Sequence, residues 1–323
     1  MIYHKFIYFE EMWHSINREI KQNEKDNLLI LATFCRLPEF AEFLVRNGAD
    51  PNYSDVHGYK AIRYAAEQKR PIINLFRCLL DAGSEVNGPI LSQRFLLLSP
   101  DIVELLLQRG ADPNECNSAA LRMSIPIYFS VSLESVEKEC LYKTIELLLK
   151  HKADPNITCD GEEPILQQAV TYRNFQIFQL LVEHGADFNG NHYNAVSVFH
   201  RTICYGFEHM IELLLQKGAD PDAVNNEGRT PLQLAVINYC KIEIFKILLE
   251  NPYRRADPNA VDSSGRTALH YTVSYGCNAE IISFLVEHGA DPERVDQTGK
   301  KPRDYLREEH KTRKIMKLLG AKL

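Results

Sequence analysis

A short string recurs along the chain at a nearly constant interval, and this repetition constrains the fold more than any other feature. GADPN stands at 48–52 and 110–114, and altered copies stand at 185–189, 218–222 and 289–293. Weaker copies begin at residues 83, 152, 255 and 320, so that the copies are on average about 34 residues apart. Periods of about 20–50 residues are typical of chains that stack many copies of one small unit.

Each unit contains a second landmark and two helical patterns. An apolar run with helical spacing precedes each marker, as in IISFLVEHG at 281–289, and the glycine there favours the end of a helix. Upstream lie GRTPLQLAV at 228–236 and GRTALHYTV at 265–273, where Thr230 can cap a helix and Pro231 suits its first turn. The sequence therefore predicts two antiparallel helices and an extended loop in each unit.

The two landmarks together resemble the ankyrin-repeat family, whose TPLH box opens the first helix and whose GAD stretch leads into a hairpin loop. The resemblance covers about residues 27–320. It implies an all-α solenoid of helix-turn-helix units with hairpin loops, about 8–9 repeats including the caps. His200 and His270 occupy the TPLH histidine position, where the family uses the imidazole to bond the loop backbone.

We expect three regions along the chain. Residues 1–26 carry an apolar stripe at helical spacing and form an amphipathic capping helix, or alternatively a helix that docks on a partner or a membrane surface. Residues 27–294 form the repeat array, and residues 295–323 form a basic capping repeat. The third and fourth repeats, at 88–156, are irregular. The third has little room for a first helix, and an insertion at 126–143 lengthens the first helix of the fourth or its inter-helix turn.

Composition and missing motifs exclude several function classes. The formal net charge of −6 gives no general attraction to nucleic acid or anionic lipid, although the basic tail could alternatively bind nucleic acid. The eight cysteines are scattered singly, so we expect reduced core thiols and no metal site. No nucleotide-binding, zinc-protease or nucleophile-elbow motif occurs. We therefore expect a cytoplasmic or nuclear protein that is not an enzyme and uses no cofactor, small-molecule substrate or membrane.

Two rows of side chains mark a candidate surface for a protein partner. Tyrosine stands just before the turn that ends the first helix in four successive repeats, with gaps of 33, 34 and 36 that keep the repeat register: Tyr172, Tyr205, Tyr239 and Tyr275. Basic residues recur after the hairpin glycine, at Arg229, Arg266 and Lys300. Because tyrosine is enriched in binding hot spots, we expect a ladder on the concave face beside the basic residues, facing an acidic or extended segment. Alternatively, each ring packs on its own repeat.

The expected function is that of a monomeric adaptor, inhibitor or recruiting scaffold that binds another protein. One alternative is a bacterial or viral effector that acts on a host protein in the host cytosol. A second is an enzyme whose site lies among residues 88–145. A third is a modification substrate, since several hairpin asparagines resemble those hydroxylated in some ankyrin proteins: Asn52, Asn114, Asn156, Asn189 and Asn259.

Overall fold

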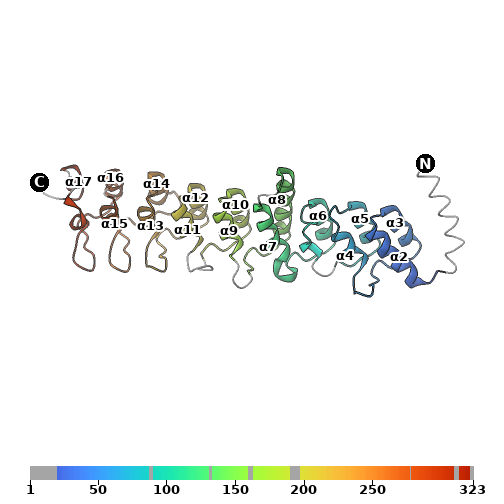
Figure 1. Ribbon diagram of the computed structural model, residues 1–323. Helices are drawn as coiled ribbons and strands as arrows, with labels where there is room; N and C mark the ends of the chain where they lie inside the picture. The colour runs from blue at the N-terminus through green and yellow to red at the C-terminus, as the bar shows by residue number, and fades with distance from the viewer. Residues whose placement is uncertain are drawn as a thin grey trace. The chain divides into compact units, whose positions relative to one another are not determined.

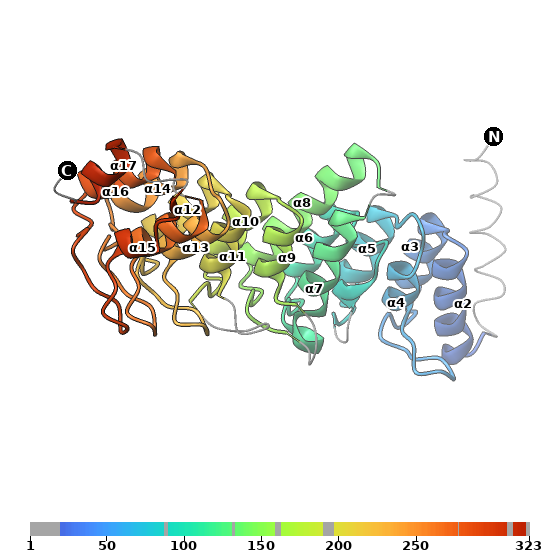
Figure 2. The same ribbon diagram turned by 60° about the vertical axis from the view of Figure 1, so that its left-hand side comes forward.

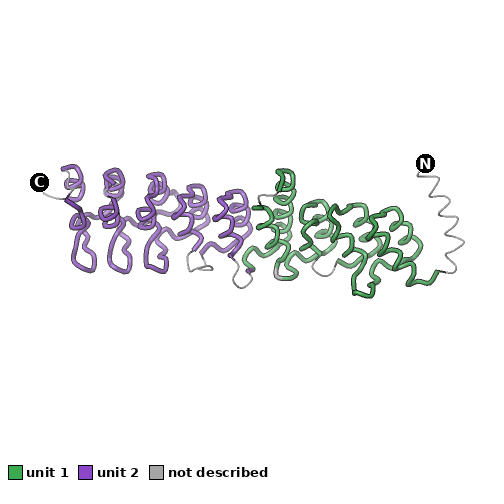
Figure 3. The backbone as a smooth tube through the Cα atoms, viewed as in Figure 1, with its two compact units in different colours: residues 1–157 green, residues 158–323 purple. Residues whose placement is uncertain are grey.

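The computed structural model describes residues 20–86, 90–130, 133–158, 163–189, 197–276, 278–308 and 313–320. The chain divides into two compact units, residues 1–157 and 158–323 (Figure 3). Each unit is a stack of helix pairs, which confirms the predicted ankyrin solenoid. Residues 1–19, where most of the expected capping helix falls, lie outside the described residues.

Unit 1 begins with two regular repeats and continues with two irregular ones. Its elements are α2 (Gln22–Phe34), α3 (Pro38–Arg46), α4 (Ala61–Ala66), α5 (Ile73–Asp81), the 3-10 helix η1 (Ile90–Ser92), α6 (Pro100–Gln108), α7 (Glu115–Phe129) and α8 (Ser135–Lys150). Helix α2 runs across the expected boundary between the capping helix, which ends at residue 26, and the array, which begins at residue 27.

The irregular repeats of unit 1 depart from the regular pattern in a way that the sequence indicated only in part. In the third repeat the first helix is reduced to η1, as expected from its length. In the fourth repeat both helices are long, α7 with 15 residues and α8 with 16. The insertion therefore lengthens the first helix, as expected, but also the second. The hydroxyl of Thr144 on α8 donates to the carbonyl of Leu97 at 2.8 Å, which joins α8 to the third repeat.

Unit 2 is regular and ends in a shortened repeat. Its elements are α9 (Ile165–Thr171), α10 (Phe175–Glu183), α11 (Val198–Tyr205), α12 (Glu208–Gln216), α13 (Pro231–Ile237), α14 (Ile242–Glu250), α15 (Ala268–Tyr275), α16 (Ala279–Glu287), the 3-10 helix η2 (Pro302–Tyr305) and α17 (Arg313–Leu318). Within this unit the first helices form one layer and the second helices another, with the hairpins extending beyond the first helices (Figures 1 and 2).

Local sequence explains where these helices begin and how they pack. Thr230 caps α13 in a capping box with Gln233, and Pro231 occupies the first turn, as predicted. The apolar faces of the second helices fill the core, where Phe178 and Phe245 are fully buried. Since one helix pair cannot cover these faces alone, each repeat depends on its neighbours. In the described part of the chain, no helix combines the length and apolar character that a membrane crossing needs.

Hairpin asparagines fasten neighbouring repeats to one another. The amide nitrogen of Asn259 donates to the carbonyl of Gly289 at 2.8 Å, and its oxygen accepts from the backbone nitrogen of Asp291 at 2.7 Å. Asn52 and Asn114 make the same pair of bonds to the following repeats in unit 1. These three side chains are therefore structural links between consecutive hairpins.

The cysteines differ from the expectation of core thiols. Cys35 and Cys116 are exposed, and the other free thiols of the described residues are half-buried, namely Cys78, Cys140, Cys204 and Cys240. Burial raises the pKa of the Cys78 and Cys240 thiols to about 11, so these two stay protonated at neutral pH. The two exposed thiols lie at helix ends, Cys35 at the cap of α2 and Cys116 in the first turn of α7.

Candidate partner-binding surface

The first helices of unit 2 bring the four predicted tyrosines into one row. Helices α9, α11, α13 and α15 pack side by side in chain order. Tyr172 caps α9, Tyr205 is the last residue of α11 and Tyr275 is the last residue of α15. Tyr239 lies two residues after the end of α13. We name these four residues the tyrosine row.

Tyr239 is not in the same register as the other three tyrosines. Its backbone is left-handed, with φ of 53°, and its nitrogen bonds the carbonyl of Val236. Arg173 and Gly206, which follow Tyr172 and Tyr205, have the same left-handed backbone, with φ of 57° and 67°, and the same bonding pattern. The expectation that all four tyrosines keep the register is therefore wrong by one residue at Tyr239.

All four rings are exposed to solvent. The exposed fractions are 53% for Tyr172, 47% for Tyr205, 73% for Tyr239 and 43% for Tyr275. The hydroxyl of Tyr239 lies 3.4 Å from the carbonyl oxygen of Tyr275, so this ring reaches over to the next repeat. The row is thus a surface of partly packed rings, in which Tyr239 is the most accessible.

Two further side chains lie beside the row, between the ends of α9 and α11. The ring of Phe207 lies 5.4 Å from that of Tyr205, centroid to centroid. The guanidinium of Arg173 lies 5.7 Å from the Phe207 centroid, within the range of a cation–π contact. Neither residue was singled out from the sequence, although Arg173 directly follows Tyr172 and Phe207 lies two residues after Tyr205.

The basic residues of the hairpins are engaged in contacts within the stack. Arg229 pairs with Glu227, and its guanidinium lies 6.0 Å from the ring centroid of Tyr271. Arg266 donates to the hydroxyl of Tyr305 at 3.2 Å, and the ammonium of Lys300 lies 5.4 Å from the same ring. Arg229 and Arg266 are half-buried, whereas Lys300 is exposed.

The structure does not bring the basic residues beside the tyrosine row. Arg229 precedes the start of α13 and Tyr239 follows its end. A helix of 7 residues such as α13 spans about 10 Å. The two rows therefore lie at opposite ends of the first helices, and a partner that contacts one row has to cross a helix length to reach the other.

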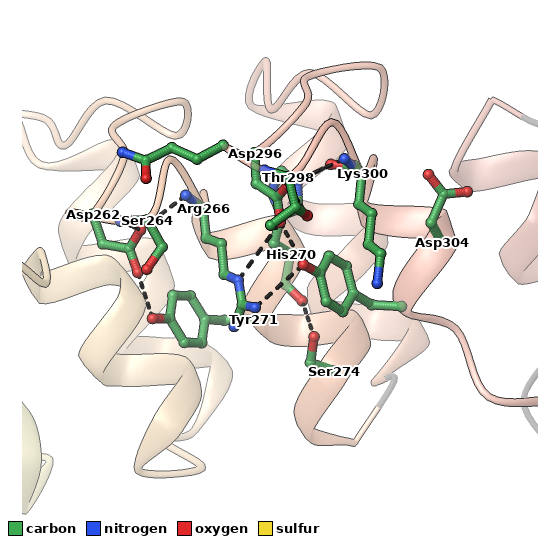
Figure 4. A network of polar contacts seen from close by, with 12 residues as sticks. Asp262, Ser264, Arg266, His270, Tyr271, Ser274, Asp296, Thr298, Lys300 and Asp304 are labelled. Carbon is green, nitrogen blue, oxygen red and sulfur yellow. Dashed lines mark hydrogen bonds and ion pairs between the residues drawn. The ribbon is translucent and has the colours of Figure 1, made fainter.

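A polar network joins the last two hairpins around Asp296 (Figure 4). This buried carboxylate accepts hydrogen bonds from the Tyr305 hydroxyl, from Thr298 at 2.7 Å and from the backbone nitrogen of Lys300 at 3.1 Å. Burial alone would raise the pKa of Asp296, but these bonds hold it well below its ordinary value. The carboxylate is therefore ionised and structural.

The pairing of a hairpin aspartate with a tyrosine nine residues later recurs in the chain. The Tyr64 hydroxyl donates to Asp55 at 2.6 Å, and the Tyr271 hydroxyl donates to Asp262 at 2.6 Å. The bond to Asp55 is the main reason that the pKa of Tyr64 is raised to about 12. The spacing is visible in the sequence as Asp-x-x-Gly with a tyrosine nine residues after the aspartate.

The histidines of the TPLH position have the expected structural role. The Nε2 atom of His200 lies 2.9 Å from the carbonyl oxygen of Ala223, and that of His270 lies 3.2 Å from that of Lys300. Because a carbonyl can only accept, Nε2 carries the proton in both rings. Burial lowers the pKa of both imidazoles, which favours the neutral form.

An open groove lies in unit 1, partly lined by residues 88–145, among which the alternative enzyme site was expected. It is lined by residues 98–102 together with Pro71, Ile73, Glu104, Cys140, Lys143, Glu146 and Leu147. Lys143 pairs with Glu139 at 3.1 Å, outside the groove lining, and this contact raises its pKa. Over the described residues, no group of three or more His, Cys, Asp or Glu side chains could hold a metal ion.

Comparison with known proteins identifies the family. The family model described as Ankyrin repeats (3 copies) matches residues 97–192, 199–296 and 242–318. The chain belongs to the ankyrin-repeat family, which mediates protein–protein interaction.

Two individual proteins resemble parts of the chain. It is 28% identical over 148 residues to the B-cell lymphoma 3 protein homolog of Mus musculus, a match that covers 43% of this chain and 31% of that protein. The crystal structure of EF0377, an ankyrin repeat protein, matches with a TM-score of 0.52 and 23% identity, over 62% of this chain and 96% of that one. The second likeness concerns the fold alone.

Proposed function

We propose that the chain is a non-enzymatic interaction module that holds a protein partner on the tyrosine row and so acts as an adaptor, an inhibitor or a recruiting scaffold. The observation that carries this proposal is the exposure of all four rings at successive helix ends of one regular stack. Tyrosine offers a large amphipathic contact area with few rotatable bonds, which makes it effective at interfaces.

The exposure of Tyr239 supports the same conclusion. A left-handed conformation costs a residue with a side chain about 1–2 kcal/mol, and the corresponding position after α11 holds Gly206. A strained residue that also exposes 73% of its surface contributes little to the stability of its own repeat. Arg173 has the same backbone at the end of α9, so the conformation belongs to the way these helices end. We place Tyr239 at the centre of the surface because it is the most exposed of the four tyrosines.

The proposal is tested by comparing the partners that the native chain and a triple variant retain from a lysate. In the variant, Tyr205, Tyr239 and Tyr275 are replaced by Ala. A matched control is Tyr253→Ala, because Tyr253 is also 62% exposed but lies in the loop after α14, away from the row. We expect a protein that is retained by the native chain and the control and lost from the triple variant.

Two measurements make the outcome decisive. Circular dichroism has to show that the triple variant keeps its helical content and cooperative unfolding. If a folded triple variant retains every partner of the native chain, the tyrosine row is not the binding surface. We further propose that the chain is a monomer in the cytoplasm or nucleus, and light scattering of the purified chain tests the oligomeric state.

A further inference from the structure

The first two repeats of unit 1 bring exposed basic side chains together at their inter-helix turns. Helices α2 and α4 pack against each other (Figure 1). The turn after α2 carries Arg36, the turn after α4 carries Lys69 and Arg70, and all three residues are exposed. The guanidinium of Arg36 donates to the carbonyl of Arg70 at 2.7 Å, so the two turns are in contact. We name these three residues, together with the neighbouring Phe34, the basic patch.

Phe34 adds an open apolar surface to these cations. It is the last residue of α2, and 59% of it is exposed. Its ring stands edge-on to that of Tyr64 on α4, with the centroids 6.1 Å apart. The ring of Tyr59, in the hairpin before α4, lies 6.0 Å from that of Tyr64. The three rings therefore form a continuous aromatic strip that leads from the basic patch to the hairpin.

The basic patch carries a net positive charge. Over the described residues, none of its three cations forms an ion pair with a carboxylate. Glu67 pairs with Arg63 at 3.0 Å. The exposed Glu39 and Asp101 line grooves between second helices, α3 with α5 and α6 with α8. Other carboxylates around the patch are engaged by neighbours: Asp55 by Tyr64, Glu85 by Lys60, Glu42 by Arg46 and Asp81 by Arg109.

The donors of the patch suit carboxylates. A guanidinium has five N–H groups and binds a carboxylate through two parallel bonds. The bond from Arg36 to the Arg70 carbonyl holds the Arg36 guanidinium in place and leaves the other donors for a ligand. Nucleic acid fits less well, because a DNA-binding surface typically contacts about 6–10 phosphates and the chain has a formal net charge of −6.

We propose that the basic patch docks an acidic segment of a partner protein, with carboxylates on Arg36, Lys69 and Arg70 and an apolar side chain on Phe34. The inference goes beyond the proposed function, because that function concerns the tyrosine row of unit 2 and is tested by other variants. Exposed ion pairs contribute little individually, so we expect three of them to favour an acidic segment about tenfold over a neutral one.

Two fluorescent peptides of about ten residues test the inference on the full chain. In the acidic peptide, three glutamates surround one leucine, and in the neutral peptide glutamine replaces each glutamate. Fluorescence anisotropy at low salt should show about tenfold tighter binding of the acidic peptide. The preference should decrease as salt is added, because salt screens exposed charges. Equal affinity of the native chain for the two peptides would overturn the inference.

Charge reversal at the two adjacent cations identifies the site. Lys69→Glu combined with Arg70→Glu should abolish the preference for the acidic peptide. This variant should instead prefer a peptide with lysine in place of glutamate, a gain that unfolding cannot produce. The matched control is Arg254→Glu combined with Arg255→Glu, because these adjacent residues are also exposed but lie in the loop after α14. If the control loses the preference as fully, the peptide responds to net charge alone and the inference fails.

Cross-linking locates the bound peptide. Cys35 stands between Phe34 and Arg36 and is exposed, and Cys116 on α7 is also exposed. A bromoacetyl group on the peptide alkylates a thiol sulfur with loss of bromide, and mass spectrometry of the digest identifies the cysteine. We expect the ratio of Cys35 to Cys116 adducts to be at least about fivefold higher for the acidic peptide than for the neutral one.

Two results would contradict a protein segment at this patch. One is an adduct ratio that is the same for both peptides. The other is an oligonucleotide of equal charge that displaces the acidic peptide as well as unlabelled peptide does at physiological salt, since the patch would then recognise anionic polymers in general.

Discussion

Replacement of Asn259 by Ala tests how strongly one hairpin holds the next. The change removes the bond to the Gly289 carbonyl, at 2.8 Å, and the bond from the Asp291 nitrogen, at 2.7 Å. A neutral hydrogen bond contributes about 0.5–1.5 kcal/mol net, and exposed partners that water can satisfy belong at the lower end. We therefore expect the link between these hairpins to weaken by about 1–2 kcal/mol.

Amide hydrogen exchange measures this link at a single atom. The Asp291 nitrogen has Asn259 as its acceptor, so local opening exposes it to exchange. A loss of about 1–2 kcal/mol corresponds to exchange that is about 5–30-fold faster. The neighbouring nitrogen of Ala290 bonds the carbonyl of Leu285 inside its own repeat, so its exchange rate should not change.

Two results would contradict this reasoning. If the Asp291 amide exchanges as slowly in Asn259→Ala as in the native chain, the side chain does not hold the hairpin. If Ala290 is accelerated equally, the asparagine stabilises the whole repeat rather than the link. Asn114→Ala repeats the experiment in unit 1, where the same two bonds measure 2.9 and 2.7 Å.

Two further predictions concern the histidines and glycines of unit 2. Burial lowers the pKa of His200 and His270. Below about pH 6.5 the unfolded chain therefore binds more protons than the folded chain, and the free energy of unfolding decreases as the pH is lowered. Gln233 occupies the equivalent position and makes the same bonds to the loop. Replacing both histidines by Gln should therefore reduce the drop in melting temperature between pH 7 and pH 5, and an unchanged drop would contradict this. Gly265→Ala should lower the melting temperature more than Gly289→Ala, because an added Cβ meets a backbone nitrogen of the next hairpin at 2.9 Å only at Gly265; equal losses would argue against close hairpin packing.

The irregular repeats show where sequence patterns stop being informative. The short third repeat could be recognised because its residue count leaves no room for a helix, and η1 confirms it. The sequence could not show how the insertion in the fourth repeat is divided between α7 and α8, since its apolar residues fit either helix. The outcome depends on packing across repeats, such as the Thr144 bond to Leu97.

For the candidate surface too, the sequence predicted some features and could not predict others. The sequence alone placed a tyrosine near the end of four first helices, because the repeat period identifies equivalent positions. It could not show that Tyr239 occupies the next position with a left-handed backbone, because its spacing differs from the others by a single residue. It also could not show that Arg229 and Arg266 are engaged by tyrosines of the following repeats, since those contacts form only when repeats stack.

The sequence by itself determined the family, the period, the helix pairs and their caps, because these depend on interactions within one repeat of about 34 residues. Only the tertiary structure decided which side chains remain accessible. Exposure depends on the repeat before and the repeat after, and on the direction in which a helix end turns. For that reason the tyrosines remain a surface that a partner can reach, whereas two of the three basic residues became part of the stack.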